Sequence, residues 1–213
     1  MKTQKHYDRI SRFYELPVVG GEIFYAKPRR RAVRELRLSN GSVVLDIACG
    51  TGLNFPLLRQ AVGPEGRIIG LDYSEGMLQR AARKIDANDW TNVSLIHDDA
   101  RNLSQELLQP YLDERQLDAV ICTLGLTVVP EWESVLDQSI SLLGDGGRYV
   151  IMDDRKFEGA KGLLNPLVCL FFTLAASADC QREPWKRLES RVADFRMSHF
   201  MWGFNFVASG TKR

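Results

Sequence analysis

The apolar residues from position 42 onward alternate between two spacings. Short, continuously apolar runs rich in β-branched residues predict five strands, at residues 43–47, 67–71, 93–96, 117–122 and 148–152. Between them, apolar residues recur every three or four positions and predict four helices, at residues 53–61, 74–85, 103–112 and 132–143. This alternation is typical of an α/β protein with a parallel sheet and right-handed crossovers. Because the strand runs have no polar face, we expect helices on both sides of the sheet.

The two ends of the chain depart from this alternation. An N-terminal helical cap is predicted over residues 1–38, with one helix at 2–16 and a second at 27–38 that begins near Pro28. After a charged helix at 183–195, residues 196–202 and 204–209 predict two antiparallel strands at the sheet edge. No linker interrupts the pattern, so a single domain is expected over residues 1–213.

Residues 155–195 are expected to form a helical lid or a substrate-facing insertion. Within them, residues 163–176 are strongly apolar but too few to cross a bilayer comfortably. They form either a buried helix or lid, or a helix that contacts lipid or a membrane. Arg30, Arg34 and Arg37 share one helix face, which is either a solvated surface or a site for an anionic substrate or membrane.

Charge and cysteine content narrow the class of protein. The 213 residues include 28 basic and 27 acidic side chains, which gives no overall argument for nucleic-acid binding. Cys49, Cys122, Cys169 and Cys180 lie far apart, so we expect buried free thiols in a reducing compartment and no metal site. The polar N-terminus does not resemble a secretory signal. We therefore expect a cytoplasmic protein, with peripheral contact at a membrane surface left open.

Acidic residues follow three successive predicted strands. Asp46 ends the first strand and precedes a glycine turn at 50–52, Asp72 ends the second, and Asp99 follows the third. Ligands of open α/β sheets bind at the carboxyl ends of the strands, where Asp72 would accept both hydroxyls of a ribose. Phe55 stands where a dinucleotide fingerprint has a small residue, which disfavours pyrophosphate binding. The pattern therefore predicts a nucleoside-sized site.

These segments resemble those of the class I S-adenosylmethionine-dependent methyltransferases. The resemblance covers about residues 7–212 and rests on residues 46–52, 70–78, 98–100 and 143–147. It implies a Rossmann-like, doubly wound sheet of seven strands in the order 3-2-1-4-5-7-6, mostly parallel with an antiparallel C-terminal strand. It also implies S-adenosyl-L-methionine as the methyl donor and S-adenosyl-L-homocysteine as the product.

The same resemblance assigns parts of the donor to residues. Asp46 and residues 48–52 would hold the methionine part, Asp72 the ribose, and Asp99 with Ala100 the adenine, while Thr123 and Leu124 would face the donor. The expected cofactor residues are Tyr14, Asp46, Ala48, Gly50, Thr51, Gly52, Asp72, Tyr73, Met77, Asp99, Ala100, Thr123 and Leu124. Tyr7 and Tyr14 resemble aromatic residues that an N-terminal helix places over the cofactor, although core packing explains them nearly as well.

Methyl transfer from a sulfonium needs an in-line approach and the exclusion of water. A phenol or carbon acid also needs a base, whereas an amine needs only to lose its proton before attack. The candidate bases are His199, Asp153 and Asp154, and no catalytic residue is assigned.

The acceptor is less well determined than the donor. Residues 7–14 and 50–57 look like the branch of quinone-precursor and phospholipid N-methyltransferases, and the apolar segment 163–176 also favours a lipophilic acceptor. An amine-bearing phospholipid is placed ahead of a quinone precursor methylated at carbon or oxygen. A soluble small-molecule acceptor, a protein substrate and a catalytically inactive, cofactor-binding regulatory subunit stay open. Nucleic acid is disfavoured, because residues 122–126 lack the Asn/Asp-Pro-Pro-aromatic loop that grips a flipped base. The oligomeric state is not predicted.

Overall fold

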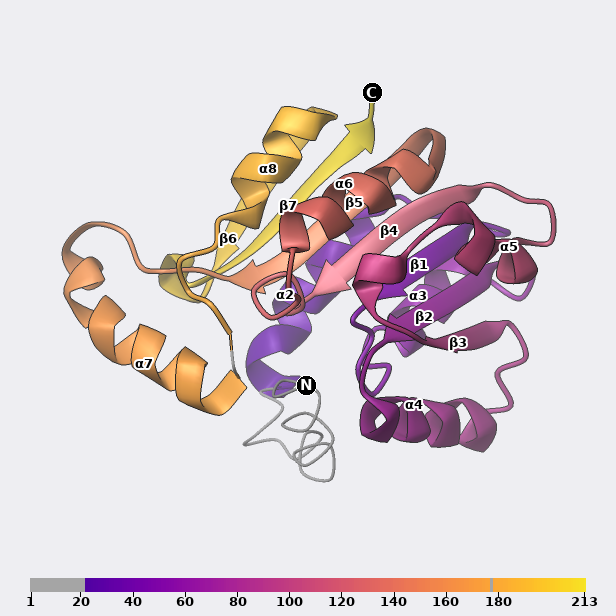
Figure 1. Cartoon of the computed structure of the whole chain (residues 1–213), viewed down its shortest axis with the longest axis horizontal. Helices are drawn as coiled ribbons and strands as arrows, with labels where there is room; N and C mark the ends of the chain where they lie inside the picture. The colour runs from indigo at the N-terminus through magenta and orange to yellow at the C-terminus, as the bar shows by residue number, and fades with distance from the viewer. Residues whose placement is uncertain (1–21, 177) are drawn as a thin grey trace.

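A seven-stranded sheet forms the centre of the molecule, shown in Figure 1, in a computed structural model that describes residues 22–176 and 178–213. The strand order is β3-β2-β1-β4-β5-β7-β6, and the β5–β7 and β7–β6 pairs are antiparallel. The strands are β1 (Val43–Ile47), β2 (Arg67–Asp72), β3 (Val93–His97), β4 (Leu117–Thr123), β5 (Leu143–Asp154), β6 (Val192–Phe200) and β7 (Asn205–Lys212). This confirms the predicted strand order and the antiparallel edge.

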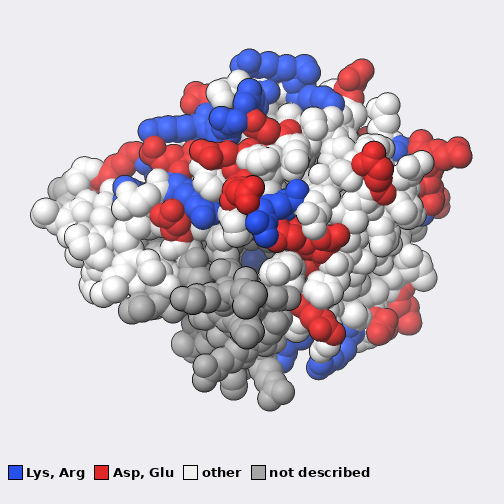
Figure 2. Space-filling view, in the orientation of Figure 1, with Lys and Arg blue, Asp and Glu red and all other residues white. Residues whose placement is uncertain are grey.

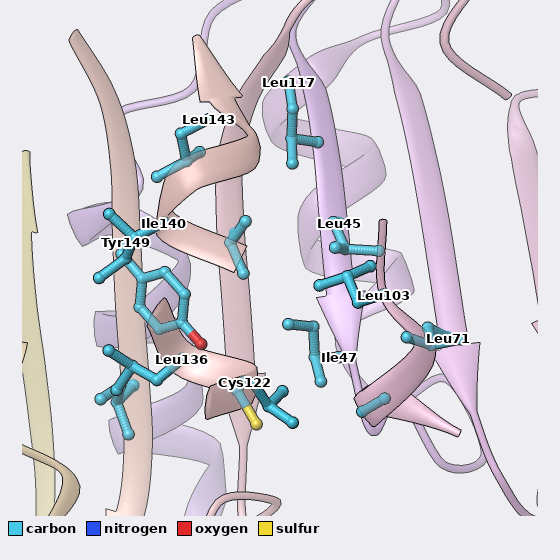
Figure 3. Close-up of a cluster of buried hydrophobic side chains, with 14 of the residues drawn as sticks. Leu45, Ile47, Leu71, Leu103, Leu117, Cys122, Leu136, Ile140, Leu143 and Tyr149 are labelled. Carbon is cyan, nitrogen blue, oxygen red and sulfur yellow. The ribbon is translucent and has the colours of Figure 1, made fainter. Parts of the chain in front are cut away.

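Helices cover both faces of the sheet, as the continuously apolar strands predict. The helices are α2 (Glu22–Glu35), α3 (Phe55–Val62), α4 (Glu75–Ala87), α5 (Gln105–Leu112), α6 (Trp132–Leu142), α7 (Asn165–Ala176) and α8 (Pro184–Arg191). Side chains of α2, α3 and α4 join one buried cluster, and those of α5, α6 and α8 join another. Successive strand residues serve opposite clusters: Val44 belongs to the first and Leu45 to the second, part of which is shown in Figure 3.

Three element boundaries differ from the predictions. Helix α2 begins at Glu22, so Pro28 lies inside it rather than at its start. The charged helix ends at Arg191, and Val192 already pairs with Lys212, because a β-branched residue adds readily to a sheet edge. Strand β5 begins at Leu143 rather than at residue 148, with an irregularity between the Leu117–Leu143 and Ala119–Arg148 pairs.

Helix α7 projects from the body of the molecule in Figure 1. Of the interpretations of residues 163–176, a fully buried helix does not agree with the structure, while a lid and a lipid-contacting helix stay predictions. Leu163 is 87% exposed and Leu167 is 70% exposed. The 3-10 turn η3 (Gly159–Leu164) leads into α7, and the ring of Phe172 contacts that of Phe204, with 5.4 Å between ring centroids. Among the described residues, no helix is long and apolar enough to cross a membrane.

The cysteines divide into two pairs. Cys49 and Cys122 are buried free thiols, as predicted, and burial raises the pKa of both. Cys169 and Cys180 form a disulfide instead, which corrects the expectation of four free thiols. Their Cα atoms lie 5.5 Å apart because the chain after α7 turns back along it, and this separation suits a disulfide. The expectation of a reducing compartment was based on four free thiols, and the disulfide removes that basis. The cytoplasmic location therefore stays a prediction.

Candidate functional site

The carboxyl ends of the central parallel strands surround a cavity. This donor cavity lies among the turns that follow β1, β2, β3 and β4. Its lining residues are Ala48, Gly50, Leu71, Asp72, Tyr73, Ser74, Met77, Asp98, Asp99, Ala100, Arg101, Thr123, Leu124, Gly125, Val128, Val129 and Pro130. The mixture of apolar walls with a few acidic groups is typical of a small-molecule site.

Asp72 connects two turns at the edge of the donor cavity. Its Oδ2 accepts a hydrogen bond from the backbone N–H of Gly50 at 2.7 Å, and its Oδ1 accepts one from the N–H of Ser74 at 2.8 Å. The Ser74 hydroxyl in turn accepts from the N–H of Met77 and caps α4, as predicted. A carboxylate that lines a cavity at the end of a parallel strand is the group that would accept the hydroxyls of a ribose.

In the glycine turn after β1, one glycine leaves space for a ligand and the other packs against the core. Gly50 has φ +56°, and a Cβ there would meet no atom within 4 Å, so its side of the turn is open to a ligand. At Gly52 a Cβ would lie only 2.4 Å from the ring of Phe55. The buried Phe55 therefore packs against Gly52, which explains why a bulky residue stands at the position that disfavoured pyrophosphate.

Thr51, between these glycines, is 1% exposed, and its hydroxyl oxygen has no hydrogen-bond partner among the described residues. A buried hydroxyl without a partner costs free energy unless a ligand or water completes it.

Asp99 is engaged by Arg101 at the far end of the donor cavity. The Arg101 guanidinium donates to both carboxylate oxygens of Asp99, at 3.1 and 2.7 Å, and also to Glu131. This hydrogen bonding to Arg101 lowers the pKa of Asp99, so the carboxylate is ionised at neutral pH. Arg101 was not predicted; it links the short 3-10 turn η2 (Ala100–Asn102) to the residue before α6.

Asp46 lies below the cavity wall in a buried polar network. The side-chain amide of Asn54 donates to both Asp46 oxygens at 3.0 Å, and Arg29 from α2 donates to the Asn54 carbonyl oxygen at 2.5 Å. Arg29 also lies 3.4 Å from the hydroxyl of Thr123, which lines the cavity. Burial raises the pKa of Asp46 to about 7, against the opposing effects of Asn54 and Arg29.

Nine of the predicted cofactor residues line the donor cavity together. They are Ala48, Gly50, Asp72, Tyr73, Met77, Asp99, Ala100, Thr123 and Leu124. Asp46, Thr51 and Gly52 lie behind this surface, and Tyr14 lies outside the described residues. The unpredicted lining includes Asp98, Arg101 and Gly125. Arg29 was missed because its partners, Asn54 and Thr123, lie 25 and 94 positions away in the sequence.

The three candidate bases occupy different environments. Asp153 is 1% exposed and accepts hydrogen bonds from the N–H and hydroxyl of Thr127, at 3.2 and 2.9 Å. Asp154 is buried between the Tyr25 hydroxyl at 2.6 Å and the Asn205 amide at 2.8 Å. His199 lies in β6 opposite Phe206, is exposed, and lines none of the cavities described here. The catalytic role of each stays a prediction.

The donor cavity fits S-adenosylmethionine. Asp72 offers ribose acceptors, and Met77 and Ala100 give apolar surface beside an acidic pair suited to adenine. The cofactor supplies an electrophilic methyl group when it is bound. The chain supplies orientation and a site shielded from water.

Comparison with known proteins agrees with this fit. Residues 44–147 match the family model for a methyltransferase domain. A demethylmenaquinone methyltransferase of Listeria welshimeri is 33% identical over 153 residues, which are 71% of this chain and 62% of that protein. The chain thus spans about three fifths of the length of the curated relatives it matches.

Two solved structures share the fold. A methyltransferase of Haloferax volcanii, described as putative and solved in complex with the Trm112 methyltransferase activator, matches with a TM-score of 0.76 and 16% identity, over 99% of this chain and 97% of that one. A SAM-dependent methyltransferase from Aquifex aeolicus matches with a TM-score of 0.63 and 18% identity, over 97% and 98%. With its strand order, its strand-end carboxylates and these sequence matches, the chain belongs to the class I S-adenosylmethionine-dependent methyltransferases.

Proposed function

We propose that the chain transfers the methyl group to a lipophilic aromatic acceptor of the quinone-precursor type, as a quinol. The observation that carries this proposal is the 33% identity, over 153 residues, to a protein named demethylmenaquinone methyltransferase. The match covers 62% of that relative. The acceptor is therefore argued from the acceptor side of this chain, defined as the first turns of α2, the end of β5, the start of β7, and α7.

The surface of α7 supports a lipophilic acceptor. The helix Asn165–Ala176 contains no charged residue, and its surroundings form a largely uncharged lobe at the left of Figure 2. Leu163, Leu164, Leu167 and Leu170 are 54–87% exposed, and Trp202 in the 3-10 turn η4 (Met201–Gly203) is 85% exposed. Exposed apolar groups in one region are typical of a binding surface. A prenyl tail is an apolar chain that this surface would bind.

The basic face of α2 gives little support to a phospholipid headgroup. Tyr25 near the beginning of α2 contacts Asp154 at the end of β5, whereas the carbonyl of Glu35 at the end of α2 accepts from Arg148, six residues earlier in β5. The helix therefore runs antiparallel to β5 and places Arg34 toward the amino end of the sheet, away from the donor cavity. The basic face of Arg30, Arg34 and Arg37 could favour an anionic headgroup, but the end of α2 that carries Arg34 lies away from the donor cavity. The relatives reported above also support the quinone-precursor alternative instead.

Methylation of defined acceptors tests the proposal. The full chain would be incubated with methyl-labelled S-adenosylmethionine and either 2-geranyl-1,4-naphthoquinol or phosphatidylethanolamine vesicles. We expect label in the naphthoquinol, with mass spectrometry placing the new methyl group on ring carbon or oxygen. The variant Asp72→Ala serves as the control that cannot hold the donor. Label in phosphatidylethanolamine alone would restore the phospholipid interpretation, and donor binding without transfer to either acceptor would favour a regulatory subunit.

A further inference from the structure

An ion pair connects two walls of the donor cavity. Residues 98–101, which follow β3, and residues 128–130, which precede α6, both line this cavity. Arg101 belongs to the first segment, and its guanidinium donates a hydrogen bond at 3.1 Å to the carboxylate of Glu131, which directly follows the second. This Arg101–Glu131 bridge therefore joins walls whose partner residues lie 30 positions apart in the sequence.

The guanidinium of Arg101 is held in a fixed orientation by Asp99. Its Nε donates to Oδ1 of Asp99 at 3.1 Å and its Nη2 donates to Oδ2 at 2.7 Å, while Nη1 reaches Glu131. An isolated ion pair at the surface contributes little, but a two-pronged contact within a network of three charges is more effective. The side chain of Asp99 is also only 15% exposed, which limits screening of this contact by solvent.

Glu131 has an unusual conformation for a residue that begins a helix. Its φ is +50° and its ψ is +33°, and among the described residues its side chain makes no capping hydrogen bond to α6. A left-handed backbone is unfavourable for a residue that carries a side chain, and such strain is found most often at functional sites. The strain is understandable here because the side chain reaches Arg101 instead of the helix.

A second arginine holds the same segment from its middle. Arg182, between α7 and α8, donates to the carbonyl oxygens of Leu126 and Val129, at 2.8 and 2.5 Å. The segment before α6 is therefore fixed at its middle by Arg182 and at its end by the bridge. Loss of the bridge should free only the end beside the donor cavity, and the fold of the segment should survive.

We propose that the Arg101–Glu131 bridge is a strap that keeps these two walls of the donor cavity together and slows release of the bound donor. Arg101 and Glu131 are then positioning residues for the donor. The inference uses the expected placement of adenine beside Asp99 and Ala100. It goes beyond the proposed function, because it does not depend on the acceptor. The walls must move apart for the adenine to leave, so breaking the bridge lowers the barrier to release.

Release of S-adenosylhomocysteine from the immobilised full chain tests the bridge, with dissociation followed by surface plasmon resonance. Glu131→Gln keeps the size of the side chain and removes its charge, so release should become about fivefold faster. Glu133→Gln changes another exposed carboxylate, in the first turn of α6, and should keep the wild-type rate. Equal denaturant midpoints of the three proteins would show that each is folded. A change of less than twofold in Glu131→Gln would overturn the inference.

The response to salt separates an ion pair from a general loosening of the loop. S-adenosylhomocysteine has no net charge near neutral pH, so added salt acts mainly on the bridge. Raising the salt concentration from about 0.05 M to about 0.5 M should at least double the release rate of the wild type. It should leave the rate of Glu131→Gln within 1.5-fold. An equal response of the two proteins would contradict the proposal.

A double-mutant cycle tests whether the two side chains act together. Arg101→Gln should release S-adenosylhomocysteine at least as fast as Glu131→Gln, because it removes both contacts of the guanidinium. The double variant should be no faster than Arg101→Gln, since the second change has no partner left to remove. Additive effects would mean that the residues act independently and would overturn the inference. No acceptor is present in these measurements, so their outcome is independent of the proposed function.

Discussion

The donor side and the acceptor side of the sheet edge differ in how far apart in the sequence their interacting residues lie. On the donor side, the functional groups stand at strand ends or within the turns that follow, as Asp72, Asp99 and Thr123 do. On the acceptor side, Asp154 is held by Tyr25, 129 positions away, and by Asn205, 51 positions away. The parallel sheet thus positions the donor groups directly, whereas the acceptor groups depend on how α2 and β7 pack against β5.

Helix α2 joins the two sides. Tyr25 and Arg29 are one helical turn apart, so they share a face; Tyr25 reaches Asp154 on the acceptor side, and Arg29 reaches Asn54 and Thr123 on the donor side. A helix that looked like a cap in the sequence therefore fixes buried polar groups in both sites. The predictions below separate these contributions, beginning with the largest effect.

Removing the guanidinium of Arg29 should be the most damaging change. Arg29→Ala leaves the Asn54–Asp46 pair buried without its charge partner, and breaking a buried ionic network typically costs about 3–5 kcal/mol. Denaturant unfolding of the two proteins measures this loss of unfolding free energy. Arg30→Ala, on the exposed face one residue away, is the matched control and should change stability by less than about 0.5 kcal/mol. Equal effects of the two variants would show that the network does not anchor α2.

Removing the carboxylate of Asp72 should weaken binding of the donor and leave the acceptor side unchanged. Asp72→Ala removes charge-assisted acceptors for two ribose hydroxyls, each worth about 1.5–3 kcal/mol, so affinity for S-adenosylhomocysteine should fall at least about 100-fold by calorimetry. Asp118→Ala is a matched control, because Asp118 also accepts a backbone hydrogen bond, from Val43 at 2.6 Å, at the opposite end of the sheet. Its donor affinity should stay within twofold. Retention of binding by Asp72→Ala would contradict the ribose assignment.

This difference in sequence separation also explains which elements and site residues could be predicted from the sequence. The strand order and nine of the donor-cavity residues followed from apolar periodicity, strand-end carboxylates and family resemblance, because neighbouring parallel strands bring their ends together. Arg29 and Asn205 could not be found in this way, since their partners are determined by helix packing and strand pairing across the chain. The apolar composition of 163–176 was compatible with a buried helix, a lid or a lipid-contacting helix, and it could not predict that Leu163 and Leu167 are exposed or that Cys169 and Cys180 form a disulfide.

The smallest effect should come from releasing α7. The disulfide closes a short loop, with Cys169 and Cys180 only 11 positions apart, on a helix whose leucines are exposed. Cys169→Ser/Cys180→Ser should therefore let α7 open locally without unfolding the sheet. Amide exchange in residues 165–176 should become at least tenfold faster, while the global unfolding free energy changes by less than about 0.5 kcal/mol and donor affinity stays the same. Wild type treated with reductant should match the double variant, which separates the loss of the bond from the effect of serine. A large loss of global stability would instead mean that α7 belongs to the same cooperative unit as the donor side, and that the two sides do not differ in how firmly they are held.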